Sequence, residues 1–324
     1  MKRFLIIGLM ATALVGCGEY NPLTNPKPAP NPNLLPGTDA PTSGRAIQRY
    51  EEEDSTGNGY AQSISYDANA DTFSVDNLAF DANNVYARDN VVPNLGGPAA
   101  SPFRVYENAA IYQDDVTGAP INQFPHKAIY GESATGRTRF AIVRTGAYIP
   151  YGFGGFMYQR DDGVVLPANG QAALVGNYAG LRDFDNRGGL EYVTGDMQVD
   201  IDFRDFNKGR GVKGSVTNRQ IFDLNGANIS GGLTTALGVA NLPVLLFVVG
   251  PGVSDNNGEV TGGVVSSYLN AGGAVQVFEE GKYYAVLSGS GADMEMTGVI
   301  VATADDPRYS GVTVRETGGF ILYR

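Results

Sequence analysis

The side chains that most often carry catalysis are scarce in this chain. It contains a single histidine, His126, and a single cysteine, Cys17. A serine nucleophile needs a base beside it, yet no serine stands in a G-x-S-x-G context. The sequence also has neither an H-E-x-x-H motif nor a phosphate loop. The residue types therefore predict no catalytic site and a protein that is not an enzyme, with an unrecognised polar active site left as an alternative.

Candidate metal ligands are equally few. Soft metal sites need clusters of Cys and His, which one residue of each type does not provide. The segment Asp205–Gly209 is faintly similar to a calcium loop, but it lacks the third acidic ligand and the distal Glu, so we interpret it as a turn. Asp200 and Asp202 share one face of a predicted strand. We interpret them as solvent-exposed carboxylates and not as an acid–base pair. We expect no metal and no cofactor.

The overall charge argues against nucleic acid as a partner. The chain has 324 residues and a formal net charge of −11. A protein that binds phosphates needs clustered Lys and Arg, and the sequence shows no such cluster. We expect the acidity to keep an exposed surface soluble.

The N-terminus has the pattern of a targeting segment. Lys2 and Arg3 precede an apolar run from Phe4 to Val15, which is too short to span a bilayer as a helix. The run ends at Gly16 and Cys17, and this ending resembles the lipobox of bacterial lipoproteins. The resemblance implies that residues 1–16 are a signal peptide and that Cys17 receives acyl chains such as palmitate. Several acyl chains anchor a protein far more firmly than one.

The segment after Cys17 predicts a spacer. In enteric lipoproteins, an Asp directly after the lipidated cysteine favours the inner membrane, and this chain has Gly18 there. The resemblance therefore favours the outer membrane of a Gram-negative envelope. It leaves open whether the protein lies on the periplasmic face or at the cell surface. Residues 17–44 are rich in Pro and Asn, which disfavour helices and sheets and favour an extended chain. We expect a tether that holds the folded part away from the bilayer.

The clearest strand pattern lies between Gly195 and Asn225. Apolar side chains from Met197 to Phe203 alternate with polar ones, which predicts a strand with one dry and one wet face. A turn and a returning strand follow, and a hairpin this long needs further strands around it. The sequence offers nine candidate strands between 171 and 324: Ala173–Leu181, Leu190–Arg204, Arg210–Leu224, Ile229–Leu237, Val244–Val249, Val260–Leu269, Ala274–Gly289, Thr297–Thr303 and Val314–Tyr323. They predict an all-β fold with a small soluble antiparallel barrel of about eight strands.

One of these segments is apolar without alternation. Pro243–Val249 carries no polar side chain. A strand covered on both faces would have this composition, with the first domain as the cover. The alternative is an apolar element that contacts a ligand.

A smaller β-rich domain is predicted over residues 45–170, with a boundary at Leu166–Gly170. Ser63–Tyr66 and Thr72–Val75 predict a hairpin. The densest aromatic run provides the candidate ligand-binding residues, and the competing interpretation is that these rings pack into the core between the domains. They are Tyr148, Tyr151, Phe153, Phe156 and Tyr158.

The second domain resembles the β-barrel domain of the transferrin-binding protein B family of surface lipoproteins. The stretches that carry the resemblance are Gly176–Gly180, Gly195–Phe203 with Gly214–Thr217, Tyr284–Gly298 and Gly318–Arg324. The family has two lobes, each with a handle domain and a barrel, and this chain has room for one lobe, in which residues 45–170 take the place of the handle. The shared positions are glycines and core apolar residues, which specify a barrel and not a ligand.

Together these patterns predict a membrane-anchored, non-enzymatic surface or envelope lipoprotein. It would be held to the outer membrane by lipid on Cys17, and it would bind a protein or a small ligand through the loops of its barrel and handle-like domain. The alternative is a structural envelope protein that contacts other outer-membrane components.

Overall fold

The computed structural model describes residues 34–55, 57–76, 78, 85–96, 102–108, 111–114, 116–122, 125–146, 150–205, 209–249 and 253–324. Leu35–Arg324 form one compact unit. The predicted signal peptide, Cys17, most of the tether and Tyr148 lie outside the described residues.

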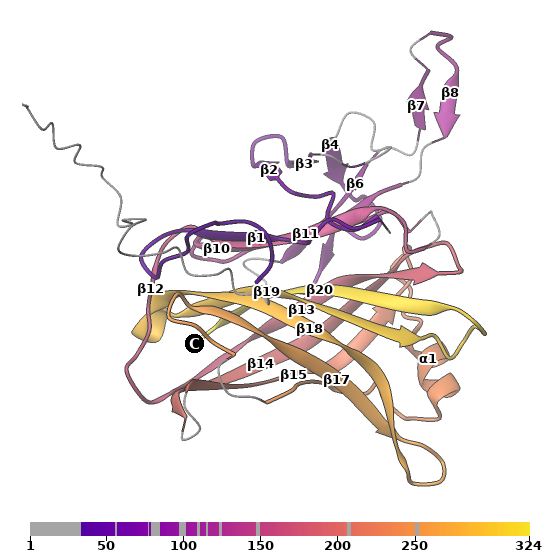
Figure 1. Cartoon of the computed structure of the whole chain (residues 1–324). Helices are drawn as coiled ribbons and strands as arrows, with labels where there is room; N and C mark the ends of the chain where they lie inside the picture. Colours follow the sequence, from indigo (N-terminus) through magenta and orange to yellow (C-terminus); the bar gives the residue numbers. More distant parts are fainter. Residues whose placement is uncertain are drawn as a thin grey trace, which may run out of the picture. The chain divides into compact units, whose positions relative to one another are not determined.

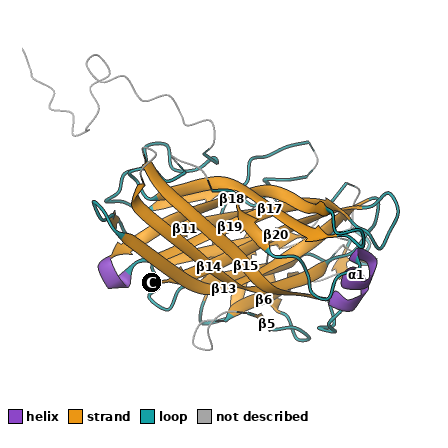
Figure 2. Cartoon of the chain, turned by 90° about the horizontal axis from the view of Figure 1, so that it is seen from below, coloured by secondary structure: helices purple, strands orange, loops and turns teal. Residues whose placement is uncertain are grey.

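The second half of the chain forms a closed antiparallel barrel of eight strands, as the alternation predicted. Each strand pairs with the next along the chain, β20 also pairs with β13, and this pairing closes the ring. Figures 1 and 2 show the strands crossing the barrel at a tilt, as closure requires. The strands are β13 (Gln171–Asp185), β14 (Glu191–Asp205), β15 (Gly209–Phe222), β16 (Leu245–Phe247), β17 (Glu259–Leu269), β18 (Val275–Ser290), β19 (Glu295–Asp305) and β20 (Thr313–Tyr323).

The predicted hairpin is β14–β15. From Met197 to Phe203 the apolar side chains are buried, and the polar ones between them are exposed or half-buried. Met197 pairs with Val216 and Ile201 with Val212, so the apolar positions of both strands point into the barrel. This confirms the prediction of one dry and one wet face.

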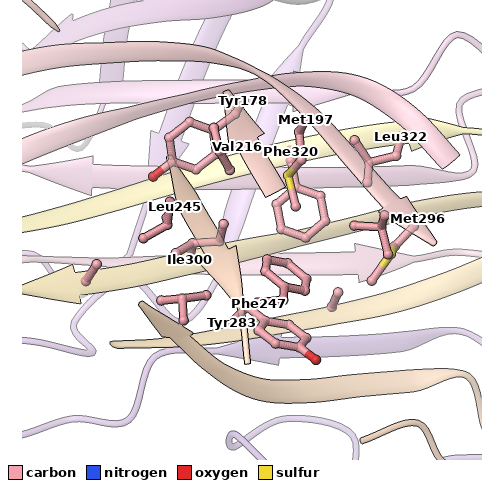
Figure 3. Close-up of a cluster of buried hydrophobic side chains, with 14 of the residues drawn as sticks. Tyr178, Met197, Val216, Leu245, Phe247, Tyr283, Met296, Ile300, Phe320 and Leu322 are labelled. Carbon is pink, nitrogen blue, oxygen red and sulfur yellow. The ribbon is translucent and has the colours of Figure 1, made fainter. Parts of the chain in front are cut away.

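Apolar side chains fill much of the inside of the barrel (Figure 3), and Arg219 forms buried ion pairs there with Glu279 and Glu316. The ring of Phe247 stacks on Tyr283 with 3.7 Å between centroids. Met197, Met296 and Ile300 fill the space between the walls. Polar side chains occupy most outward positions of β14 and β15, so this part of the barrel wall is apolar inside and polar outside.

The strand predicted at Ile229–Leu237 is wrong, because this segment forms the α-helix α1 (Ser230–Leu237). Leu233 and Leu237 are four residues apart, so they share one face of the helix and reach the barrel core. Gly238 ends the helix in the left-handed region, with φ of 70°, and its N–H bonds to carbonyls of the last turn. The helix lies at one end of the barrel (Figure 2).

The first half of the chain forms a second antiparallel sheet, here called the handle sheet. Its order is β1-β11-β10-β9-β6-β4-β3-β2, and β5 pairs with β6. The predicted hairpin is confirmed as β2 and β3. The strands are β1 (Ile47–Tyr50), β2 (Ile64–Asp67), β3 (Thr72–Val75), β4 (Val85–Arg88), β5 (Asn94–Leu95), β6 (Phe103–Asn108), β9 (Lys127–Glu132), β10 (Thr138–Arg144) and β11 (Gly154–Arg160). Two short pairings lie outside this sheet: β7 (Ile111–Gln113) pairs with β8 (Pro120–Asn122), and β12 (Val164–Val165) pairs in parallel with β18 of the barrel.

Strands β10 and β11 of the handle sheet lie on β13 and β18–β20 of the barrel (Figure 1). Apolar side chains from both sides form one buried cluster at this junction. The ring of Phe140 of β10 packs against Gly319 of β20, where an added Cβ would lie 2.1 Å from a ring carbon. The glycine therefore permits an approach that no other residue would allow.

Ion pairs also join the handle sheet to the barrel. Arg49 of β1 binds Glu259 of β17 through two parallel bonds, Nε to Oε1 at 2.6 Å and Nη2 to Oε2 at 2.9 Å. Arg144 of β10 bonds to Thr317 at 3.1 Å, and its Nε lies 3.7 Å from Asp183 of β13. These side chains are all buried, so each charge depends on its partner.

Glu295 is a further buried carboxylate at this junction. It accepts hydrogen bonds from the hydroxyls of Ser133, Thr135 and Thr138, at 2.8–3.0 Å. The partners come from the β9–β10 connection and the start of β10, so Glu295 ties the handle sheet to β19.

Candidate functional site

The apolar segment Pro243–Val249 contains β16, the shortest strand of the barrel. Leu245 and Phe247 point into the core, while Leu246 between them is 48% exposed. The residues on either side, Val244, Val248 and Val249, are exposed as well. The segment lacks polar alternation because its outward positions are apolar too, and these positions face solvent.

Neighbouring strands extend this apolar surface. Leu246 pairs with Val265 of β17, and Val248 donates its N–H to Gly263 at 2.8 Å. At the β17–β18 turn, Leu269 pairs with Val275, and Ser267 pairs with Val277. Continuing the β16 register by one residue places Val244 opposite Ser267, in line with Val277, and strands in a sheet lie about 4.8 Å apart.

We call these exposed side chains the aliphatic patch: Val244, Leu246, Val248, Val249, Leu269, Val275 and Val277. Glu280 and Lys282 of β18 are exposed beside it. An apolar centre with a charged border is the composition of protein-binding surfaces. The patch has no acid, base or nucleophile, so it can interact with another molecule only through apolar contacts.

The prediction that the first domain covers Pro243–Val249 is wrong. The handle sheet lies on β13 and β18–β20, and the outward side chain of Leu246 is exposed. The sequence alone showed the apolar run, but Leu269, Val275 and Val277 were missed. A signal existed in the apolar outward positions on both sides of the Asn270–Gly273 turn, where hairpin ends are commonly polar.

The structure separates the candidate aromatic residues. Phe156 and Tyr158 lie in the buried junction between the handle sheet and the barrel, where burial raises the pKa of Tyr158. Tyr151 is half-buried in the loop before β11, with its hydroxyl 2.9 Å from that of Thr313. Phe153 is half-buried and packs edge-on against Tyr60. None of these four belongs to the aliphatic patch.

The remaining sequence candidates lie apart from one another. His126 is fully buried in the handle sheet, with its ring edge-on to Tyr86. Asp200 and Asp202 lie on the outer face of β14, and Asp202 accepts a bond from Gln171 at 3.0 Å. Within the described ranges, no group of three or more His, Cys, Asp or Glu side chains is placed to hold a metal ion. The same ranges contain no helix long and apolar enough to cross a membrane.

The geometry thus defines an all-β protein with an eight-stranded barrel beside a handle-like sheet, which is the fold that the resemblance implied. No protein-family model matches the chain, and no curated protein matches its sequence.

Two solved structures match the chain. One is the vaccine antigen Transferrin Binding Protein B of Haemophilus parasuis Hp5, with 11% identity, a TM-score of 0.38, and coverage of 86% of this chain and 45% of that chain. The other is intact Ap-TbpB with its N and C lobes, with 14% identity, a TM-score of 0.32, and coverage of 81% and 46%. The present chain spans less than half the length of either protein.

Proposed function

We propose that this chain is a lipid-anchored, non-enzymatic binding protein of the bacterial outer membrane that takes a protein partner through the aliphatic patch and the loops beside it. The observation that carries the proposal is the patch itself. Seven exposed Val and Leu side chains gather on β16, on the residues beside it and at the β17–β18 turn. Scattered exposed apolar residues are ordinary, but a contiguous group usually marks an interaction surface.

The position of the patch supports the same function. The handle sheet lies on β13 and β18–β20, which leaves β16 and β17 open to a second molecule. Tyr151 and Phe153, both half-buried, remain candidates for contacts from the loop before β11. In this proposal residues 45–170 and 171–324 are the handle-like and barrel domains of one binding body, and residues 17–44 tether it to lipid on Cys17.

The anchor is tested by metabolic labelling with a palmitate analogue. We expect the label on the native chain and its loss in Cys17→Ser, because the thiol is the acceptor. Labelling that survives this substitution contradicts the anchor. Protease treatment of intact cells then distinguishes the cell surface from the periplasmic face.

The binding surface is tested by in-cell photo-crosslinking. A photoreactive amino acid at position 246 is expected to give a discrete crosslinked partner. The same amino acid at position 175 is the matched control, because Val175 is similarly exposed on β13 but lies outside the patch. Equal products at both positions, or none at 246, would contradict the proposal. A crosslink only to integral envelope components would favour the structural envelope role instead.

A further inference from the structure

A cleft of about 230 Å³ lies on the outer wall of the barrel, where Gly96, the residue that follows β5, lies beside β13, β14 and β15. Its side chains are the amides of Asn177, Asn218 and Gln220, the hydroxyl of Thr194 and the carboxylate of Asp196. Gly96, next to β5 of the handle sheet, forms one edge, and a Cβ added to it would lie 3.8 Å from Cβ of Ala179 and 3.9 Å from Cβ of Asn177. The cleft therefore sits at the boundary between the handle sheet and the barrel, a common place for ligand sites.

Strand register sets these polar groups in two rows. Asn177 pairs directly with Asp196, and Thr194 pairs with Gln220. Asn218 donates from Nδ2 to Oδ2 of Asp196 at 2.7 Å. The side chains of Asn177 and Thr194 make no hydrogen bond within the described part of the chain. The cleft thus presents free donors and acceptors on a rigid sheet, where little ordering is needed on binding.

A β-bulge shapes the floor of the cleft. Two residues of β15, Asn218 and Arg219, stand opposite Gly195 of β14. Arg219 turns inward to the buried carboxylates of Glu279 and Glu316, and this leaves Asn218 pointing outward with φ of 51°. The bulge itself is explained by the need to place Arg219 inside.

The identity of the outward residue is not explained by the bulge. Glycine adopts a positive φ more readily than Asn, so the backbone alone would favour glycine at position 218. The chain instead keeps an amide there, aimed at the carboxylate in the cleft. Strained positions of this kind are typical of functional sites.

We propose that this cleft binds a neutral, hydroxyl-rich ligand, namely one sugar ring of a glycan. Amides and a carboxylate pair with hydroxyl groups as both donors and acceptors. No Lys or Arg lines the cleft and Asp196 is acidic, which disfavours anions; no large apolar side chain lines it, which disfavours apolar ligands. The volume is below the range of drug-sized ligands, roughly 300–1,000 Å³, and suits a single small ring.

The test is saturation-transfer NMR on the purified full-length chain with glucose, galactose, mannose and N-acetylglucosamine. We expect transfer to at least one sugar, with a millimolar dissociation constant, because one ring makes few contacts. Asn218→Gly keeps the left-handed backbone and removes the amide. It should weaken binding by about tenfold without lowering the thermal unfolding temperature.

Asn186→Gly is the matched control. Asn186 also has a positive φ, of 63°, but lies outside the cleft, so its substitution should leave sugar binding unchanged. The proposal is overturned if none of the four sugars receives transfer, or if Asn218→Gly binds as well as the native chain. It is also overturned if calcium ions alone bind at Asp196 and no sugar does.

Discussion

The buried pair of Arg49 and Glu259 gives a sharp test of how the handle sheet is held on the barrel. Their side chains are 5% and 1% exposed. Burial alone would lower the pKa of Arg49, but the hydrogen-bonded carboxylate of Glu259 outweighs it and raises that pKa. Arg49 also donates to the carbonyls of Leu35 and Thr38, so it fixes the chain entering β1 as well.

Arg49→Met should lower the free energy of unfolding by about 3–5 kcal/mol, because it leaves the Glu259 carboxylate buried without its partner. Glu259→Met should lower the free energy of unfolding by a similar amount, because it leaves the Arg49 guanidinium buried without its partner. The double variant removes both charges and should be more stable than either single variant, although the carbonyls of Leu35 and Thr38 lose a donor. The expected coupling energy is at least about 2 kcal/mol.

Urea unfolding followed by tyrosine fluorescence measures these values, since the chain has 18 Tyr and no Trp. Arg139→Met is the control: Arg139 and Asp161 are 29% and 39% exposed, so breaking this pair should cost less than about 1 kcal/mol. Strictly additive effects in the double variant would refute the reasoning.

Two further predictions concern other parts of the fold. Burial opposes ionisation of Asp89, but the Lys127 ammonium at 2.6 Å and two backbone N–H groups hold its pKa below the usual value. The stability that Asp89 adds is thus present above about pH 4 and lost as the pH falls through the lowered pKa. Asp89→Asn should lower the free energy of unfolding by about 2–3 kcal/mol at pH 7, and this difference from the native chain should shrink in acid. A difference that does not change with pH in urea unfolding would contradict the role given to the Asp89 carboxylate. Gly238→Ala should cost about 1 kcal/mol, because alanine is strained at φ of 70°; an unchanged unfolding temperature would show that α1 does not depend on this cap.

The barrel was predictable because its signal is local. Alternation from Met197 to Phe203 reports a strand with one buried face whatever its neighbours are. The same reasoning failed at Ile229–Leu237, because Leu233 and Leu237 are spaced for a helix and no strict alternation was present to oppose it. It also failed on the cover of Pro243–Val249, because composition shows that a segment is apolar and not which face is exposed.

The junction and the cleft were beyond sequence reasoning for a different reason. Arg49 and Glu259 are 210 positions apart, and nothing local pairs them. The side chain of Asn218 is aimed by a bulge whose register appears only when β14 and β15 are paired. Such contacts depend on long-range register, and a single sequence does not encode them as a readable pattern.

The junction also determines how the two proposed binding surfaces would work. Each buried ion pair across it is strongly unfavourable to separate, because separation exposes apolar surface and leaves charges without partners in a dry site. The handle sheet and the barrel therefore behave as one body, and β13 and β18–β20 are committed to holding them together. The aliphatic patch lies on a wall that this contact leaves open, and the polar cleft lies at the edge of the contact, between β13–β15 and Gly96. Both surfaces are consequently formed before any ligand arrives, so a partner pays little for ordering them and rigid docking is the mode of binding that this fold supports.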